Sequence, residues 1–183
     1  PPDAAERSER VLALAHFFGV AAEKQQLTDL LTTELENLPT GSARARACLL
    51  LPGGAVRRND EIRAFLERAL AESEGLPEER GVVLANMATN EAVIRVERIR
   101  DAEAWAEEAL AAVPATGEEM QRIALYSLAW PRSLRGRPID DLRARFAALS
   151  NSALYLLGTP DRIAGQQFAW RGRLDEARAL LST

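Results

Sequence analysis

The stretch Asn59-Asp60-Glu61-Ile62-Arg63-Ala64-Phe65-Leu66-Glu67-Arg68-Ala69-Leu70-Ala71 sets the pattern of the whole chain. Its apolar residues fall at positions i, i+3, i+4, i+7 and i+8, which is the spacing of one face of an α-helix. The end of this stretch, 67–71, recurs forty residues later as Glu-Glu-Ala-Leu-Ala at 107–111, and Ala129-Trp130 recurs at the same interval as Ala169-Trp170. A period of this length predicts a repeat architecture with two helices per unit.

The composition supports a helical fold. The 183 residues include 33 Ala and 26 Leu but only 9 Pro and 11 Gly, and aromatic residues make up 5%. Alanine and leucine are strong helix formers, so the composition predicts an all-α protein. With 47% hydrophobic and 27% charged residues, the chain is expected to fold around a packed core and not to be disordered.

Periodicity and helix-breaking residues together predict ten helices. They are expected at 3–19, 23–37, 42–51, 59–74, 78–99, 101–112, 117–130, 138–150, 160–171 and 173–182. Because an amphipathic hairpin cannot bury its apolar face alone, we expect five hairpins to stack as a right-handed, tetratricopeptide-like α-solenoid, a single repeat domain over 1–183. Segment 150–158 is read either as a continuation of a helix or as a packed loop.

Several classes of protein are disfavoured by what the sequence contains. One cysteine and one histidine provide neither an internal disulfide nor a Cys/His zinc cluster, and no cofactor is expected. The longest uncharged stretch, 146–160, falls short of the roughly 20 apolar residues of a membrane span. The first residues do not resemble a signal peptide, so we expect a cytoplasmic fragment of a longer chain.

Charge is distributed unevenly along the chain. The net charge is −4, with residues 1–120 carrying −9 and residues 121–183 carrying +5. An acidic chain is not expected to bind nucleic acid through bulk charge. Only one of the 23 basic residues is a lysine, Lys24, which we attribute to a GC-rich genome before any selection for phosphate binding.

One candidate interaction surface lies in the basic third of the chain. It comprises Trp130, Arg132, Arg135 and Arg137, residue types that are enriched at binding hot spots and suit an acidic peptide or a phosphorylated ligand. The segment 135–137 has a parallel Arg-Gly-Arg at 171–173. The alternative interpretation is that Trp130 and Trp170 are core residues at equivalent repeat positions, flanked by exposed arginines of a turn.

Other chemically active residues are given structural roles. His16 has no nearby acid and nucleophile, so it is read as a structural or half-buried histidine. Cys48, between apolar residues, is read as a small buried side chain, with Arg44 and Arg46 as the reason to check its reactivity. Pro52-Gly53-Gly54 is read as a turn, and the paired acidic residues are read as helix starts or exposed faces.

The C-terminal segment 169–181 resembles the turn and second helix of a tetratricopeptide repeat, with matches at Gly172, Glu176 and Ala177. More specifically, segments 38–51, 123–130 and 135–142 resemble the repeat region of large ATP-binding LuxR-family (MalT-like) regulators. That resemblance implies a sensor segment between an ATPase and a helix-turn-helix domain. No Gly-x-x-x-x-Gly-Lys-Ser/Thr loop surrounds Lys24, so ATP is not expected to bind within these residues.

Three functions remain open from the sequence. The first is a non-enzymatic sensor or protein-interaction segment of a LuxR-type regulator, which binds an inducer or a protein partner. The second is a free-standing scaffold that holds peptides or partner helices. The third, a helical-bundle enzyme, is disfavoured because the chain lacks a Glu-x-x-His pattern. An uncovered apolar stripe over Leu174–Leu181 also predicts that the fragment self-associates or is less stable than a longer chain.

Overall fold

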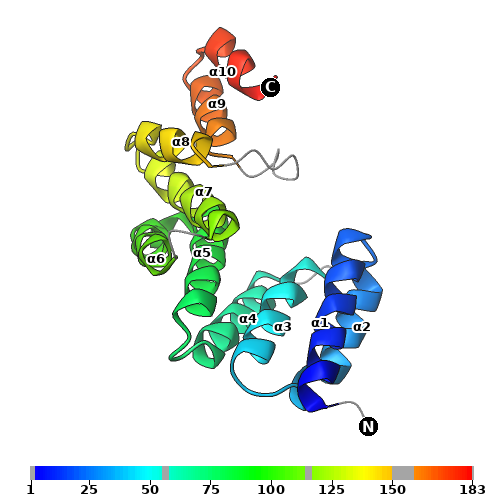
Figure 1. The fold of residues 1–183 in the computed structure, drawn as a ribbon. Helices are drawn as coiled ribbons and strands as arrows, with labels where there is room; N and C mark the ends of the chain where they lie inside the picture. Colours follow the sequence, from blue (N-terminus) through cyan, green and yellow to red (C-terminus); the bar gives the residue numbers. More distant parts are fainter. Residues whose placement is uncertain (1–2, 55–57, 114–116, 150–158, 183) are drawn as a thin grey trace. The chain divides into compact units, whose positions relative to one another are not determined.

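The computed structural model describes residues 3–54, 58–113, 117–149 and 159–182, and over these residues the chain is all-helical (Figure 1). It divides into two compact units, unit 1 (Pro1–Val83) and unit 2 (Leu84–Thr183). The α-helices are α1 (Ala4–Val20), α2 (Lys24–Glu34), α3 (Ser42–Leu50), α4 (Asn59–Glu72), α5 (Pro77–Ile94), α6 (Ile99–Ala112), α7 (Glu118–Leu134), α8 (Asp140–Ala147), α9 (Pro160–Trp170) and α10 (Leu174–Leu181). Short 3-10 turns occupy Leu35–Asn37, Leu51–Gly53 and Val96–Arg98.

All ten helices expected from the periodicity are present, and the all-α class is confirmed for the described residues. Two boundaries differ from the prediction by more than three residues. The helix expected at 78–99 ends at Ile94, where a 3-10 turn leads into α6, and the helix expected to end at 130 continues to Leu134. The alternatives for 150–158 concern residues outside the described part of the chain. The stacking of all hairpins into one solenoid stays a prediction.

In unit 1, α1 packs against α2 and α3, and α3 packs against α4. The apolar stripe of segment 59–71 faces this core, with Leu66 and Ala69 buried. Leucines from α1 and α2 and the small residues of α3 complete it; they include Leu12, Leu27, Leu31, Ala45, Ala47 and Cys48. Alanine at the contact positions allows the helices to approach closely while leucines fill the space between them.

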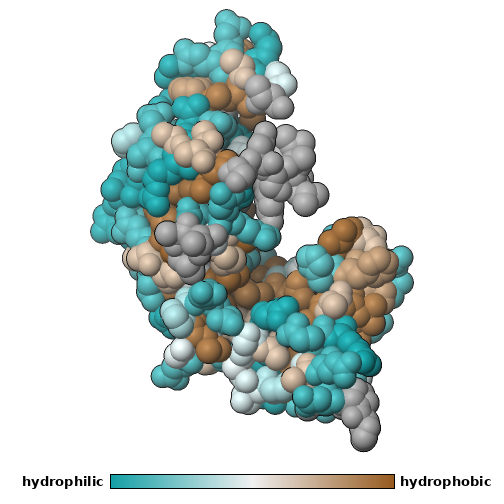
Figure 2. All heavy atoms as spheres, viewed as in Figure 1, coloured by the Kyte–Doolittle hydropathy of each residue, from teal (hydrophilic) through white to brown (hydrophobic). Residues whose placement is uncertain are grey.

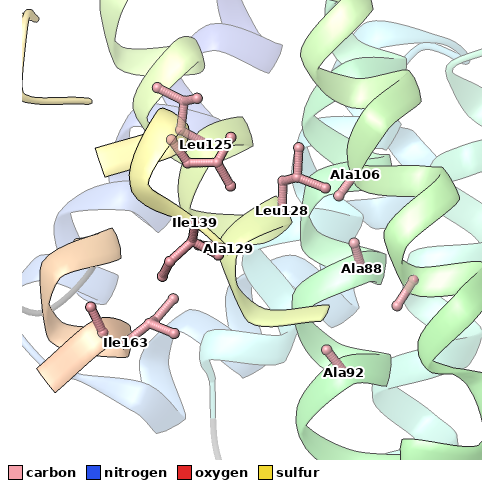
Figure 3. Packing of buried hydrophobic residues seen from close by; sticks show 11 residues of the cluster. Ala88, Ala92, Ala106, Leu125, Leu128, Ala129, Ile139 and Ile163 are labelled. Carbon is pink, nitrogen blue, oxygen red and sulfur yellow. The ribbon is translucent and has the colours of Figure 1, made fainter. Parts of the chain in front are cut away.

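In unit 2, α6 pairs with α7, α7 with α8 and α9, and α9 with α10. Figure 3 shows its central cluster, where alanines of α5 and α6 meet leucines of α7 and isoleucines from the start of α8 and from α9. The buried members are Ala88, Ala92, Ala102, Ala106, Leu125, Leu128, Ala129, Ile139, Leu142, Ile163 and Ala164. The start of α9 follows the expected capping chemistry, because Thr159 Oγ1 accepts a hydrogen bond of 3.2 Å from the Arg162 N–H and Pro160 occupies the first turn.

The extension of α7 through Pro131 is the boundary error that matters for function. A proline lacks the N–H of the helical hydrogen bond, which is why the sequence predicts a stop there. In the structure Pro131 and Ser133 are buried, and Gln167 Nε2 of α9 donates a 2.8 Å hydrogen bond to the Ser133 carbonyl. Packing therefore outweighs the lost hydrogen bond. The helix ends at Leu134, four residues after the predicted end at 130, and an Arg-Gly-Arg turn follows.

Within the part of the chain that the structure describes, no helix combines the length and the hydrophobicity needed to cross a lipid bilayer.

Candidate functional site

The arginines predicted as an exposed patch gather around one buried carboxylate. Glu103 on α6 is only 3% exposed, and both Arg135 and Arg137 donate to it. The Nε of Arg132 lies 3.8 Å from the same carboxylate, and this side chain also reaches Asp141 at 3.0 Å. Burying a carboxylate is costly unless it is paired with a cation. The three guanidinium groups offset the desolvation cost of this one acid.

The tryptophan of the predicted patch packs against the core of unit 2. Trp130 is half-buried against the unit 2 core and stands edge-to-face with Tyr126 at a centroid distance of 6.4 Å. Its indole N–H is buried and has no hydrogen-bond partner among the described residues. Trp170, expected at an equivalent core position, is 66% exposed, so the core interpretation is wrong for that residue.

The two Arg-Gly-Arg segments form the same backbone turn. The N–H of Arg137 donates to the Arg132 carbonyl, and the N–H of Arg173 donates to the Phe168 carbonyl, both over 2.9 Å. The glycine between each pair of arginines has a positive φ, 71° at Gly136 and 74° at Gly172. This is the glycine C-cap that ends a helix by satisfying its last carbonyl groups. The parallel seen in the sequence is therefore a structural equivalence.

Both turns line one cavity of unit 2. The cavity has a volume of about 400 Å³ and lies among the α7–α8 turn, α8, α9 and the α9–α10 turn. Four arginines and a single acidic residue contribute to its wall, together with a phenylalanine and a glutamine: Arg137, Arg143, Arg171, Arg173, Asp140, Phe168 and Gln167. Of the residues predicted for the interaction surface, only Arg137 reaches this cavity.

The four cavity arginines differ in how fully acids neutralise them. Arg143 donates to Asp161 over 2.5 Å and to Asp140 over 3.1 Å, and the hydrogen bond to Asp161 is the main cause that raises its pKa. Arg173 pairs with Glu176 and lies over the Phe168 ring, 4.4 Å from its centroid. Arg137 shares Glu103 with its neighbours.

Arg171 differs from the other three cavity arginines. It is exposed, and it forms no ion pair with any described residue. Its guanidinium group is therefore available to a ligand without first giving up a carboxylate.

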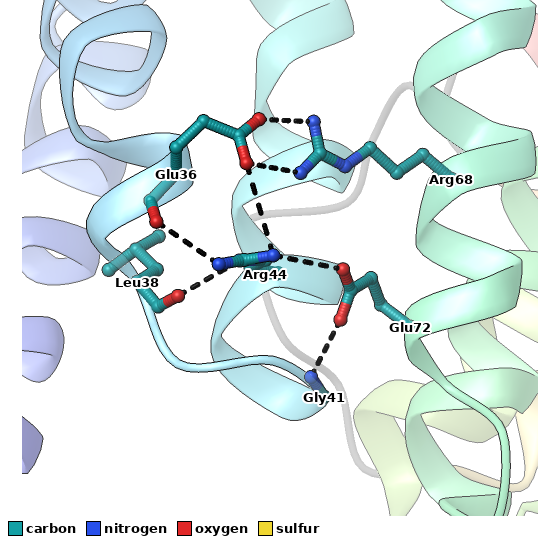
Figure 4. Close-up of polar contacts among 6 residues, drawn as sticks. All are labelled: Glu36, Leu38, Gly41, Arg44, Arg68 and Glu72. Carbon is teal, nitrogen blue, oxygen red and sulfur yellow. Dashed lines mark hydrogen bonds and ion pairs between the residues drawn. The ribbon is translucent and has the colours of Figure 1, made fainter.

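A second arginine cluster, in unit 1, is fully engaged within the protein (Figure 4). Arg44 donates to the Leu38 and Glu36 carbonyls over 2.9 and 3.1 Å, and it lies 3.6 Å from Glu72. Arg68 binds the Glu36 carboxylate with two hydrogen bonds, which lower the pKa of Glu36. The Gly41 N–H donates to Glu72, so the cluster ties the segment before α3 to α4. We assign it a structural role.

The cysteine and the histidine carry no reactive geometry. Cys48 is fully buried as predicted, and desolvation raises the pKa of its thiol to about 11 despite nearby arginines. Arg46, one of the two residues that prompted the check, pairs instead with Glu9 at 2.9 Å. His16 is exposed and not half-buried as expected. Over the described ranges, no group of three or more His, Cys, Asp or Glu residues could hold a metal ion.

Sequence reasoning missed Glu103, Arg143, Arg171, Arg173 and Phe168 as parts of the site. The available sign was the second Arg-Gly-Arg, which repeats the first. Comparison of the chain with protein-family models, curated proteins and solved structures gave no match.

Proposed function

We propose that this chain is a non-enzymatic, cytoplasmic helical-repeat segment that senses a ligand within a LuxR-type (MalT-like) transcriptional regulator. The observation that carries the proposal is the unit 2 cavity lined by two equivalent repeat turns. Cavities of a few hundred Å³ with converging polar groups are the usual sites of small-molecule recognition. The tetratricopeptide-like sequence of 169–181 supports the repeat assignment. The similarity of 123–130 and 135–142 to the regulator family supports the place of this segment within such a regulator.

The proposed mechanism is a shift between two states of the parent regulator. A ligand that contacts both Arg-Gly-Arg turns holds the end of α7 and the end of α9 in one fixed arrangement. If the ATP-bound regulator favours that arrangement, the differential affinity of the ligand is transmitted to the ATPase and helix-turn-helix segments. The segment itself would bind neither ATP nor DNA and would require no cofactor.

The coding sequence on both sides of this segment tests the proposal. We expect an upstream Gly-x-x-x-x-Gly-Lys-Ser/Thr loop and a downstream helix-turn-helix. If both are absent from the parent gene, the regulator assignment is wrong.

A free-standing scaffold is the second candidate, and an exposed apolar surface in unit 1 favours it. Phe17 and Val20, in the last turn of α1, are 62% and 76% exposed, and Leu14 one turn earlier is 44% exposed. Figure 2 shows hydrophobic side chains gathered over this end of α1. Exposed apolar residues that cluster in this way are typical of protein-interaction surfaces.

The scaffold candidate is tested by a pull-down that compares matched variants. The double variant Phe17→Ser with Val20→Ser removes the α1 surface, while Val93→Ser removes an apolar residue that is 59% exposed on α5. The scaffold role predicts that a protein retained by the wild-type chain and by Val93→Ser is lost with the double variant. Retention by all three chains would reject this surface.

A further inference from the structure

We propose that the unit 2 cavity binds a phosphate group carried by a small molecule. The inference rests on the proposed sensing role and names the ligand class for that site. Gene context tests the role and a titration tests the ligand, so each can fail without the other.

The first argument is the charge left without acidic partners. Arg135 and Arg137 share the single carboxylate of Glu103, whereas neighbouring Arg132 also has Asp141 at 3.0 Å and Glu107 at 3.6 Å. Arg171, at the opposite turn, forms no ion pair with any described residue. A wall with one uncompensated arginine, and a second, Arg137, whose only acid is shared, suits an anion such as a phosphate monoester, which carries about −1.5 to −2 at neutral pH.

The second argument is the geometry of the groups at the wall. A guanidinium presents its N–H donors in a planar fork that matches two oxygens of a phosphate. Gly136 lines the cavity beside Arg137, and no atom lies within 4 Å of the place where a Cβ would stand. A ligand can therefore approach the backbone at this turn, and Arg137 and Arg171 come from the two turns that line the cavity.

The third argument concerns the size and the apolar part of the wall. The volume of about 400 Å³ exceeds the need of a phosphate ion and lies within the range of small-molecule sites, roughly 300–1,000 Å³. Arg173 lies over one face of the Phe168 ring, 4.4 Å from its centroid. Ile139, Ala164 and Phe168 supply the apolar part of the cavity wall, against which an organic group can pack. The cavity is thus better suited to an organic phosphate than to the free ion.

Isothermal titration calorimetry on the complete 183-residue chain tests the inference with three probes: inorganic phosphate, phenyl phosphate and succinate. We expect phenyl phosphate to bind. The variant Arg171→Ala should weaken its binding by about tenfold or more, the range expected when a charge-assisted hydrogen bond is lost. Because Arg171 is exposed and makes no ion pair with a described residue, the variant should fold normally, which far-UV circular dichroism checks.

Arg145→Ala is the matched control. Arg145 lies in the last turn of α8, is exposed like Arg171, and does not line the cavity. Its removal lowers the net charge equally and should leave binding unchanged. Tighter binding of phenyl phosphate than of inorganic phosphate would support both the phosphate site and its organic ligand, whereas equal affinities would support the phosphate site and contradict the organic part of the inference.

Three results would overturn the inference: no heat of binding with either phosphate probe, equal weakening by Arg171→Ala and Arg145→Ala, or succinate binding as tightly as phenyl phosphate.

Discussion

The turn between α1 and α2 in unit 1 has the same hydrogen bonds as the two Arg-Gly-Arg turns of unit 2. The Glu23 N–H donates to the Phe18 carbonyl over 2.9 Å, as the Arg137 and Arg173 N–H groups do to the carbonyls five residues before them. Yet the central residue in unit 1 is Ala22, with a φ of 59°, and no arginine flanks it.

This difference separates the fold from the chemistry. The backbone turn forms with glycine or with alanine, so it is set by helix termination and packing. The arginines are not needed for the turn, since unit 1 makes it with Ala21 and Glu23 in their places. What distinguishes the unit 2 turns is that they carry cations into a cavity.

The largest expected effect concerns the acid that holds those arginines. Glu103→Ala should lower the free energy of unfolding by about 2 to 3 kcal/mol, because Arg132, Arg135 and Arg137 lose the buried carboxylate that they share. The value stays below that of a fully buried pair since Arg135 and Arg137 are 34% and 47% exposed and can turn to water. Urea unfolding followed by tryptophan fluorescence measures it, because all three tryptophans lie in unit 2.

Glu36→Ala in unit 1 is the counterpart of that change. Glu36 also binds two arginines but is 70% exposed, so its loss should lower the free energy of unfolding clearly less than the loss of Glu103, as measured by urea unfolding. Similar losses for both variants would show that burial of the acid does not decide its contribution.

The next effect in size is a pH dependence that originates in unit 1. The thiol of Cys48 has a folded-state pKa of about 11, above its ordinary value of 9.0, because burial disfavours the thiolate. The unfolded chain therefore releases its proton first, and stability should fall as pH rises from about 9 to about 11. The loss attributable to this group approaches roughly 2 kcal/mol.

The variant Cys48→Ala isolates this contribution from other groups that titrate at alkaline pH. Urea midpoints of the two proteins, followed by far-UV circular dichroism, should differ by a constant amount below pH 9. Above pH 9 this difference should shrink, because only the protein with the thiol loses stability. A constant difference from pH 7 to 11 would contradict the burial of the thiol.

The smallest effects come from the turn residues themselves. Gly136→Ala and Gly172→Ala should each lower the unfolding free energy by about 1 kcal/mol, because alanine is strained at positive φ while a Cβ meets no atom within 4 Å. Ala22→Gly should raise it by about 0.5 kcal/mol, since relief of that strain is partly offset by the freer unfolded chain. Thermal unfolding of the three variants checks both signs. A stabilising Gly172→Ala would show that the turns are not equivalent.

Helix positions were predictable from the sequence because apolar periodicity and breakers act locally. The predicted helix end before Pro131 was wrong because the proline rule considers only the one missing N–H. The burial of Pro131 and the hydrogen bond from Gln167 depend on a helix that is distant in the sequence. Glu103 was missed for a related reason. It lies between Ala102 and Ala106 on the buried face, but a glutamate in a helix is ordinarily exposed until its partners are known.

The candidate site was predictable only in part. The sequence identified Arg135 and Arg137, and it aligned their turn with 171–173. Nothing local indicates that the turns after α7 and after α9 line one cavity, because that depends on how α7, α8 and α9 pack. Tertiary structure likewise determines which acid each arginine pairs with, and hence which arginine is left without an ion pair and can bind a ligand.

The burial of Cys48 also makes unit 1 report on its own openings. As the only thiol in the chain, it can be alkylated only when the packing around α3 opens and water reaches the sulfur. Under native conditions the rate of labelling by iodoacetamide, divided by the rate for the unfolded chain, gives the equilibrium constant of that opening. The population of the open state in this part of the molecule can therefore be measured without introducing a probe.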